Sequence, residues 1–364
     1  MKILLVGGGS GGPVAPMLAI AEHIKSRHPK AQFLLVGTHG GPEKHMAQKA
    51  GIAFSSITTG KLRRYFSWRN FITPILVVVG FFQSQKILNS FKPDCIFGTG
   101  SFVQVPLVWA AWFKRIPVVL HQQDVSPSLA NKLCQWAAKK ITVTFKYSLT
   151  SFYTGLGIFY KKKQSDKIVF TGNAFREELK HGLREAGQKQ FNLQKDLPTL
   201  LVLGGGTGAE YLNTLILKCL PELSKSVQII HSTGAGKFNN VQNENYHAYE
   251  FIDNMANAYA AADIVLARAG LSTITELSNL KKLSIIVPMP GTHQDLNAYL
   301  LIHNNAAIVL SQKKITLAGF VNLVRRLLFA QEAQDVLTQN IGELMPHDSN
   351  DKISSIILKL AEKS

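Results

Sequence analysis

Two glycine-rich turns, each lying between an apolar run and an amphipathic run, constrain the fold of this chain more than any other feature. Residues 7–12 (GGGSGG) follow the apolar run 2–6, and residues 204–209 (GGGTGA) follow the apolar run 199–203. A strand, a glycine turn and a helix open a βαβ unit of a parallel sheet. Because the turns begin 197 residues apart in a chain of 364, we predict an α/β protein with two doubly wound domains in tandem.

Short apolar runs continue this rhythm through both halves. Strands are predicted in the first half at 2–6, 32–36, 95–97, 118–120 and 141–143, with helices around 14–27 and 42–49. After a lysine-rich stretch near 161–166 the pattern restarts, with strands predicted at 199–203, 227–231, 264–267 and 284–287. We therefore place an N-terminal domain at residues 1–165 and a C-terminal domain at residues 166–345.

The cysteines and apolar runs favour a soluble protein of a reducing compartment. Cys95, Cys134 and Cys219 lie far apart with no C-x-x-C pair, which argues against a disulfide framework and a cysteine zinc site. The apolar run at 2–6 is too short for a signal peptide. The longest apolar stretch, 71–82, has 12 residues, whereas a bilayer span needs roughly 18 to 20. We expect no membrane span and a cytosolic location.

Positive charge is concentrated in the first half. Residues 1–165 contain 21 Lys and Arg against four Asp and Glu, whereas residues 166–364 contain 19 of each kind. This asymmetry implies an anionic partner for the first half alone. The basic residues accompany an apolar segment, and no helix-turn-helix, zinc-finger or RNA-recognition signature occurs, so nucleic acid is not the expected partner. An anionic membrane surface or a lipid-linked phosphate fits better.

The glycine turns have more than one interpretation. They let a phosphate approach N–H groups at a helix N-terminus, and both also match the dinucleotide fingerprint G-x-G-x-x-[GA]. A dinucleotide site needs an acidic residue where the second strand ends, and residues 36–39 (VGTH) and 231–234 (HSTG) offer none. NAD or FAD is therefore disfavoured, whereas tight strand–helix packing alone stays an alternative for each turn.

Seven motifs together resemble the MurG family, the UDP-N-acetylglucosamine:lipid I N-acetylglucosaminyltransferases of peptidoglycan synthesis. In chain order they are the first glycine turn, HQQD at 121–124, TGN at 171–173, the second glycine turn, FIDNM at 251–255, RAGLSTITE at 268–276 and HQDLNA at 293–298. The resemblance covers essentially the whole chain. It implies a two-domain GT-B fold with a cleft, inverting chemistry, attachment to the cytoplasmic face of the membrane, and a last helix at 346–364 that returns to the N-terminal domain.

The second half has the parts that a sugar-nucleotide site needs. Glu276, near the start of a predicted helix, suits both ribose hydroxyls, and Ser272 and Thr273 in the preceding turn suit the diphosphate; favourable charge at the helix start and N-capping are the alternatives. By resemblance, the Ile252 backbone contacts uracil, Gln294 and Asn297 face the sugar hydroxyls, and Arg176 faces a phosphate. The alternatives are exposed loop polarity for Gln294 and Asn297 and an inter-domain ion pair for Arg176. It assigns UDP-GlcNAc binding to Ser10, Gly11, Gly12, Asp124, Arg176, Gly206, Thr207, Ile252, Leu271, Ser272, Thr273, Glu276, Gln294 and Asn297.

The first half is expected to bind the acceptor and the membrane. By resemblance the acceptor diphosphate lies against the loop of Gly9, Ser10, Gly11 and Gly12. Cations interleave with aromatic residues after position 60, and such residues favour an anionic interface, although a buried helix with a basic edge is an alternative. The predicted membrane-facing residues are Lys61, Arg63, Arg64, Tyr65, Phe66, Trp68, Arg69 and Phe71.

Departures from the family pattern affect the catalytic base. The family's first loop ends Gly-Gly-His, but this chain has Pro13, which cannot take a proton. The family motif His-Glu-Gln-Asn is HQQD here and introduces Asp124. We predict that Asp124 removes the proton from the acceptor hydroxyl, with His121 as the second candidate. Gly206 replaces a common serine, so its phosphate contact would come from the backbone, and Ala174 replaces a usual proline.

The expected reaction is transfer of GlcNAc from UDP-GlcNAc to the muramyl 4-hydroxyl of lipid I, giving lipid II with inversion. No Asp-x-Asp occurs, so no metal clamp is expected, and no cofactor is needed. Three alternatives stay open. They are a GT-B enzyme with another lipid-linked acceptor, a UDP-GlcNAc 2-epimerase, and a UDP-GlcNAc-binding relative that has lost catalysis.

Overall fold

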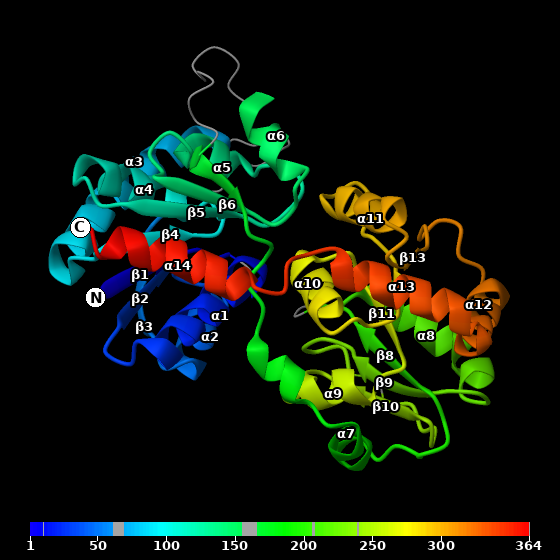
Figure 1. The fold of residues 1–364 in the computed structure, drawn as a ribbon. Helices are drawn as coiled ribbons and strands as arrows, with labels where there is room; N and C mark the ends of the chain where they lie inside the picture. The colour runs from blue at the N-terminus through cyan, green and yellow to red at the C-terminus, as the bar shows by residue number, and fades with distance from the viewer. Residues whose placement is uncertain (10, 61–68, 155–165, 206–207, 239, 364) are drawn as a thin grey trace. The chain divides into compact units, whose positions relative to one another are not determined.

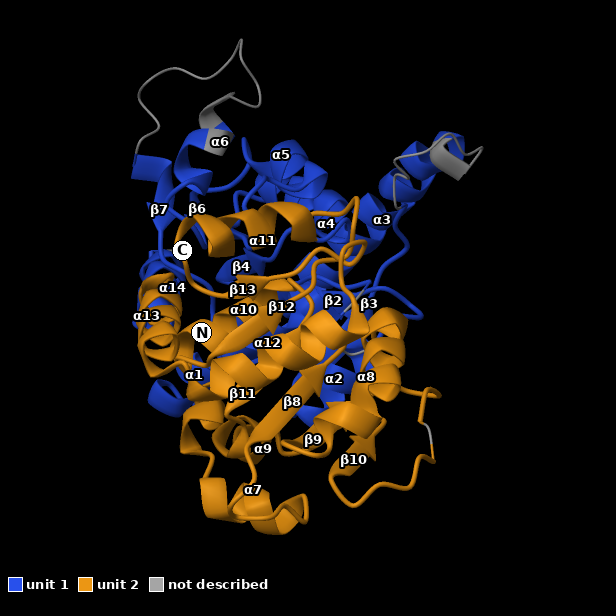
Figure 2. Cartoon of the chain, turned by 90° about the vertical axis from the view of Figure 1, so that its right-hand side faces the viewer, with its two compact units in different colours: residues 1–175, 346–364 blue, residues 176–345 orange. Residues whose placement is uncertain are grey.

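The computed structural model describes residues 1–9, 11–60, 69–154, 166–205, 208–238 and 240–363. These residues form two compact units, which Figure 2 colours separately. Unit 1 comprises residues 1–175 and 346–364, and unit 2 comprises residues 176–345. Each unit is a parallel sheet with helices packed on it (Figure 1), so the α/β prediction is confirmed.

Unit 1 contains a seven-stranded parallel sheet with the order β3-β2-β1-β4-β5-β6-β7. Its strands are β1 (Lys2–Val6), β2 (Gln32–Gly37), β3 (Ala53–Ser56), β4 (Cys95–Gly98), β5 (Val118–Gln122), β6 (Lys140–Val143) and β7 (Ile168–Phe170). Its helices are α1 (Gly11–Arg27), α2 (Glu43–Lys49), α3 (Arg69–Phe91), α4 (Gln104–Phe113), α5 (Leu129–Cys134), α6 (Ser148–Thr154) and α14 (Ser349–Ala361).

Apolar residues on both faces of the central strands hold unit 1 together. Along β1, Leu4 and Val6 belong to the core cluster beneath α4 and α5, whereas Ile3 and Leu5 belong to the cluster beneath α1 and α14. Successive side chains of a strand point to opposite faces, so a strand that is covered on both sides is apolar at every position. This arrangement explains why the first strand reads as a continuous apolar run.

Unit 2 contains a six-stranded parallel sheet with the order β10-β9-β8-β11-β12-β13. Its strands are β8 (Thr199–Leu203), β9 (Gln228–Ser232), β10 (Tyr246–Tyr249), β11 (Ile264–Ala267), β12 (Ser284–Ile286) and β13 (Ile308–Val309). Its helices are the 3-10 helix η2 (Glu177–His181), α7 (Arg184–Gln190), α8 (Glu210–Leu223), α9 (Met255–Ala261), α10 (Leu271–Asn279), α11 (Gln294–His303), α12 (Leu317–Phe329) and α13 (Gln331–Glu343).

Both sheets reverse their strand order at the strand that carries the glycine turn. β1 lies between β2 and β4, and β8 lies between β9 and β11. In open parallel sheets, ligands bind outside the carboxyl ends of the strands at such a reversal. Leu203 at the end of β8 pairs with Ala267 at the end of β11, so the second glycine turn and the start of α10 lie at the same edge.

The first unit extends ten residues beyond the domain boundary expected at residue 165. Strand β7 pairs in parallel with β6, with Ile168 opposite Ile141, and it therefore belongs to the first sheet. A strand of three residues beside a lysine-rich stretch carries too little periodicity to be predicted. The chain passes to unit 2 only after Phe175.

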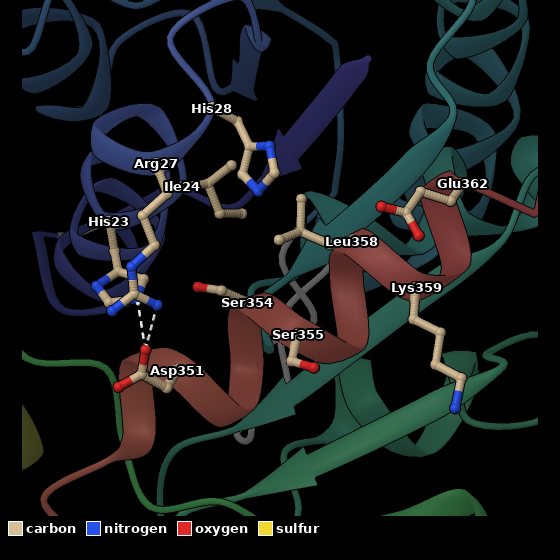
Figure 3. A pocket seen from close by; sticks show the side chains of 10 residues that line it. All are labelled: His23, Ile24, Arg27, His28, Asp351, Ser354, Ser355, Leu358, Lys359 and Glu362. Atoms are coloured by element: carbon tan, nitrogen blue, oxygen red, sulfur yellow. Dashed lines mark hydrogen bonds and ion pairs between the residues drawn. The ribbon is translucent and has the colours of Figure 1, made fainter.

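The C-terminal helix α14 packs on α1 (Figure 1). Ile353 and Ile357 enter the same buried cluster as α1. Figure 3 shows Asp351 of α14 accepting hydrogen bonds from α1, with its Oδ1 atom 3.2 Å from Nε2 of His23 and also bonded to Arg27. These contacts make residues 346–364 an integral part of unit 1.

Helix α3 is longer than the apolar stretch that the sequence displays. Residues 71–91 of α3 are a stretch of 21 residues with mean hydropathy 1.5 over its most apolar 18 residues, which by length and composition alone is enough to cross a membrane. Our expectation of no possible span counted only 12 of these residues. However, the inner face of α3 packs against α4, with Phe81 and Leu88 in or against the core of unit 1. The helix is thus part of the α/β fold.

Candidate active site

The N-terminus of α10 lies at the strand-order reversal of unit 2. The helix begins at Leu271, and its N-cap, Gly270, provides no side-chain hydrogen bond. Ser272 and Thr273 therefore lie in the first helical turn and are partly exposed, rather than in the turn before the helix as expected. A helix N-terminus carries partial positive charge and unpaired N–H groups, so this end of α10 suits a phosphate.

Glu276 lies one turn further along α10 and is held by two side chains. Its Oε1 atom accepts a hydrogen bond from Arg176 at 2.7 Å, and its Oε2 atom accepts one from the hydroxyl of Tyr259 at 2.6 Å. The Glu276 side chain is 14% exposed and the Arg176 side chain 34%. A carboxylate therefore faces a cation at the edge where a nucleotide is expected.

The Glu276 carboxylate acts to raise the pKa of both of its partners. Burial acts to lower the pKa of Arg176, but the Glu276 carboxylate, together with Glu178 and Tyr259, outweighs burial and the pKa is raised. Burial, reinforced by the same carboxylate, raises the pKa of Tyr259 well above its ordinary value. Tyr259 therefore stays protonated and donates its hydrogen to Glu276.

The two residues expected at the sugar hydroxyls occupy different environments. Gln294 is partly exposed at the start of α11 and accepts a hydrogen bond from the backbone N–H of Met289 at 3.0 Å. Asn297 is 1% exposed, and its Nδ2 atom donates to the carbonyl of Ala269 at 3.1 Å. Asn297 therefore fixes the turn before α10, and its buried side chain leaves little surface for direct contact with the sugar.

The loop between β10 and α9 buries the residue expected at uracil. Ile252 is 3% exposed, and the exposed side chain of Asn254 caps α9 by accepting from the N–H of Asn257 at 3.1 Å. Leu271 is 6% exposed and belongs to the packed side of α10. Both residues can therefore offer a ligand only their backbone atoms or a small edge of the side chain.

The second glycine turn is built on backbone that a side chain would strain. Gly205 and Gly208 have φ of +79° and +71°, in the left-handed region that favours glycine. A Cβ atom at Gly208 would lie 2.0 Å from the carbonyl oxygen of Thr233. Gly206 and Thr207, the predicted donor-binding residues of this turn, lie outside the described residues.

A buried carboxylate lies beneath the first glycine turn. Glu43 is 0% exposed and accepts hydrogen bonds from the backbone N–H of Gly9, at 3.2 Å, and from that of Thr38, at 2.6 Å. A Cβ atom at Gly8 would lie 2.3 Å from Oε1 of Glu43, so a side chain there would displace this carboxylate. The chain thus folds a carboxylate back to the end of β2, where the sequence offered none.

This carboxylate changes what the first turn can bind. The N–H of Gly9, expected at the acceptor diphosphate, is already used by Glu43. Gly11 and Gly12 form the start of α1, and Gly12 is exposed with no heavy atom within 4 Å of its Cβ position. Any phosphate at this turn therefore meets the helix start rather than Gly9, and Ser10 lies outside the described residues.

The two candidate bases differ sharply in burial. Asp124 follows β5 and is partly exposed, in a loop that Gln122 holds by donating to the carbonyls of Asp124 and Ser126, each at 2.8 Å. His121 is 0% exposed, with Nδ1 2.8 Å from the Thr142 hydroxyl and Nε2 2.8 Å from Oδ1 of Asn173. A fully enclosed ring with both nitrogens engaged cannot reach a substrate, which removes His121 as a base.

Two buried histidines, His121 and His231, should make the free energy of unfolding depend on pH. Burial lowers the pKa of His121 and of His231 to about 4 each. In the unfolded chain these groups titrate near 6.5, so the unfolded state binds more protons between pH 6.5 and pH 4. Unfolding free energy should fall as pH drops through this window, by about 2 kcal/mol for each histidine between pH 7 and pH 5.

Urea unfolding at pH 7 and pH 5 measures this effect. A His231→Gln variant should lower stability at pH 7, since His231 contacts Tyr246 and Asn213, but should lose its share of the pH dependence. Equal stability of the unmodified protein at both pH values would show that the two rings are not buried in the neutral form.

The predicted membrane-facing residues fall mostly outside the described part of the chain. Residues 61–68 and the side chain of Arg69 are not described. Phe71 in the first turns of α3 is 73% exposed. Of the predicted residues, Phe71 is thus the one whose side chain is described, and its membrane contact stays a prediction.

Comparisons with known proteins identify the family. Residues 3–143 match the glycosyltransferase family 28 N-terminal domain, and residues 199–345 match the glycosyltransferase family 28 C-terminal domain. A UDP-N-acetylglucosamine--N-acetylmuramyl-(pentapeptide) pyrophosphoryl-undecaprenol N-acetylglucosamine transferase of Lachnospira eligens is 35% identical, with 98% of each chain covered. The chain belongs to this transferase family. A transferase of the same name from Clostridium kluyveri is 36% identical, over 86% of this chain and 88% of the relative.

Solved structures support the same fold for this transferase. MurG of Acinetobacter baumannii has a TM-score of 0.71 and 23% identity, covering 98% of this chain and 99% of its own. A UDP-GlcNAc 2-epimerase of Neisseria meningitidis has a TM-score of 0.69 and 15% identity, covering 99% and 100%. The two domain matches and these structures show a GT-B glycosyltransferase with two Rossmann-like domains. The enzyme is an N-acetylglucosaminyltransferase.

Two residues of this transferase were not found by sequence reasoning. Tyr259 lies in the alanine-rich helix α9, where an aromatic residue is typical of an ordinary core position. Glu43 is the only acid in residues 38–50, which follow β2, and this isolated acid is the sequence feature that could have indicated a carboxylate near the first glycine turn. Both act through contacts distant in sequence, 17 residues for Tyr259 and 34 residues between Glu43 and Gly9.

Proposed function

We propose that this transferase moves GlcNAc from UDP-GlcNAc to the muramyl 4-hydroxyl of lipid I, forming lipid II in peptidoglycan synthesis. The observation that carries the proposal is the pairing of Glu276 with Arg176 beside the start of α10, at the strand-order reversal of unit 2. The first turns of α10 provide a carboxylate for ribose hydroxyls and unpaired helical N–H groups, and Arg176, which lies before η2, provides a cation for phosphate. The names of the relatives state both substrates, UDP-N-acetylglucosamine and N-acetylmuramyl-(pentapeptide) pyrophosphoryl-undecaprenol.

The donor is bound by unit 2. The ribose lies at Glu276, and the diphosphate at Ser272, Thr273 and the start of α10, with Arg176 as its cation. The backbone of Ile252 contacts uracil, and Gln294 contacts the sugar. Positive charge that is already in place where UDP leaves stabilises the departing diphosphate without reorganisation.

The acceptor is bound by unit 1, with its diphosphate at Gly11 and Gly12 of α1. Asp124 takes the proton of the 4-hydroxyl as that oxygen forms a bond to the anomeric carbon. The bond from the anomeric carbon to the diphosphate oxygen breaks on the opposite face, so the configuration inverts and UDP departs with the electron pair. His121 acts only by ordering Asn173 and strand β6 from within the core.

The outer surface of unit 1 supports attachment to a membrane. Six apolar side chains of α3 follow helical spacing and are all at least 37% exposed, namely Phe71, Ile72, Ile75, Val78, Val79 and Phe82. Aromatic contacts continue this surface, because Phe81 lies against Phe113 with ring centroids 5.6 Å apart and Trp112 against Trp136 at 4.9 Å. A monomeric soluble protein seldom exposes so large an apolar patch.

Basic residues border this apolar surface. Lys86 on α3 is exposed, as are Lys114 and Arg115 just after α4. Near an anionic leaflet such residues each contribute about 1 kcal/mol, and aromatic side chains favour the interface. Helix α3 therefore lies along the cytoplasmic leaflet with its outer face in the lipid, while its inner face stays in the core of unit 1.

A substitution on α3 tests the membrane assignment. Phe82→Glu, at a side chain that is 67% exposed, should reduce binding to vesicles of phosphatidylglycerol and phosphatidylcholine by about tenfold and leave UDP-GlcNAc binding unchanged. Phe329→Glu is the matched control, because Phe329 is 88% exposed but belongs to unit 2. Equal vesicle binding by the two variants would contradict this assignment.

Incubation with UDP-GlcNAc alone separates transfer from epimerisation, which the shared fold makes the relevant alternative. The transferase should leave UDP-GlcNAc unchanged until lipid I is added, and should then give a lipid one N-acetylhexosamine heavier. Formation of UDP-N-acetylmannosamine without an acceptor would instead assign the protein to the epimerases.

A further inference from the structure

We infer that Tyr259 is a positioning residue that sets the ribose specificity of the donor site by holding the Glu276 carboxylate, while Arg176 is a replaceable partner of the same carboxylate. This inference rests on the proposed donor site. It concerns a hydroxyl that is buried in unit 2 and that touches no substrate. The relevant contacts are the two hydrogen bonds that end on the two oxygens of Glu276.

The two partners of Glu276 differ in how firmly they are fixed. Tyr259 is 1% exposed and lies in α9, so its ring cannot leave without opening the core. The Arg176 side chain is 34% exposed, and its second contact is with Glu178 at 3.4 Å, where the glutamate side chain is 58% exposed. Arg176 can therefore turn toward a phosphate, whereas Tyr259 stays on the carboxylate.

This difference gives each contact a separate role. When a diphosphate binds, Arg176 turns toward this more highly charged anion. Oε1 of Glu276 can then accept hydrogen bonds from other donors. Tyr259 continues to donate to Oε2 at 2.6 Å, which keeps the carboxylate from rotating to follow Arg176. The remaining lone pairs then face the ribose, and two hydroxyls can donate to them.

Removing the Tyr259 hydroxyl should therefore affect recognition of the ribose hydroxyls and little else. In Tyr259→Phe, nothing holds Oε2 of Glu276, so the carboxylate can rotate to follow the guanidinium of Arg176 as it turns to the diphosphate. The ribose would then compete with Arg176 for the same oxygens. Helix α9 directly follows the loop with Ile252, so the same helix links the uracil and ribose positions.

The experiment compares dissociation constants for UDP and 2′-deoxy-UDP, measured by calorimetry. The unmodified protein should prefer UDP by about tenfold or more, the value expected for a hydrogen bond to a charged group. Tyr259→Phe should weaken UDP binding by about tenfold and weaken 2′-deoxy-UDP, which keeps only the 3′-hydroxyl, by less, so that most of the preference is lost. A preference retained in Tyr259→Phe would overturn the inference and leave the proposed donor site intact.

Matched variants separate positioning from general loss of structure. Tyr246→Phe removes another tyrosine hydroxyl of unit 2. Tyr246 is 5% exposed and its hydroxyl lies 2.9 Å from Nδ1 of His231. This variant should keep the preference for UDP. Arg176→Gln should weaken UDP and 2′-deoxy-UDP equally, because Tyr259 still holds Glu276. Loss of the preference in Arg176→Gln would overturn the inference even if Tyr259→Phe does not fold.

The unmodified protein provides the last distinction. If it binds UDP but does not prefer it over 2′-deoxy-UDP, Glu276 does not contact the 2′-hydroxyl, and both the ribose assignment and the inference fail together. A preference that is present in the unmodified protein and lost only in Tyr259→Phe supports both.

Discussion

Asp124→Asn should reduce the turnover number by about a thousandfold with saturating UDP-GlcNAc and a soluble lipid I analogue. General bases contribute about 10² to 10⁴ to enzymatic rates, and an amide cannot accept the proton of the attacking hydroxyl. Because Asp124 belongs to unit 1, the dissociation constant for UDP-GlcNAc should change less than about twofold. Turnover is measured as UDP release, and donor binding by calorimetry.

Asp94→Asn is the control for this prediction. Asp94 is another of the few acids in the first half, and its Oδ2 atom accepts from the backbone N–H of Lys2 at 2.7 Å. Its replacement should lower thermal stability and leave turnover close to that of the unmodified protein. Turnover of Asp124→Asn above a tenth of normal would mean that another group takes the proton.

Glu276→Gln should weaken UDP-GlcNAc binding by about 100-fold. The amide loses the charge that pairs with Arg176 and accepts through one oxygen only, so it cannot serve both the Tyr259 hydroxyl and the ribose as the carboxylate does. Each hydrogen bond to a charged group contributes about 1.5 to 3 kcal/mol, which corresponds to the expected loss. Calorimetric titration with UDP-GlcNAc measures it.

Glu178→Gln controls for a general effect of removing negative charge near Arg176. Glu178 lies 3.4 Å from Arg176, but its side chain is 58% exposed, and exposed ion pairs contribute only about 0 to 1 kcal/mol. Donor affinity should therefore change less than about threefold in this variant. Similar losses in Glu178→Gln and Glu276→Gln would show that Glu276 acts through charge alone and does not bind the ribose.

Much of the fold could be predicted because local pattern and tertiary environment agree along the central strands. The run at β1 is apolar at consecutive positions since both faces of the sheet are covered, and the same holds for β8. Glycines mark the turns after these strands because Gly9 and Gly208 have φ of +82° and +71°, which a side chain would strain. Strands β7 and β13, with three and two residues, carry no such pattern.

The candidate site could be predicted only in part, because burial depends on contacts far along the chain. His121 and Asp124 belong to one motif, yet the first is enclosed between Thr142 and Asn173 and the second is partly exposed. Asn297 is polar in sequence but turns inward to the Ala269 carbonyl. Glu276 could be placed from its position in a helix, whereas its partner Tyr259 resembles any core aromatic residue until the helices pack.

UDP release from UDP-GlcNAc, measured in EDTA with and without a short-chain lipid I analogue, tests the central claim most directly when the mass of the lipid product is recorded. We expect release to depend on the acceptor, to proceed in EDTA, and to add one N-acetylglucosamine to the lipid. Tight binding of UDP-GlcNAc without acceptor-dependent release would contradict the proposed transfer to lipid I.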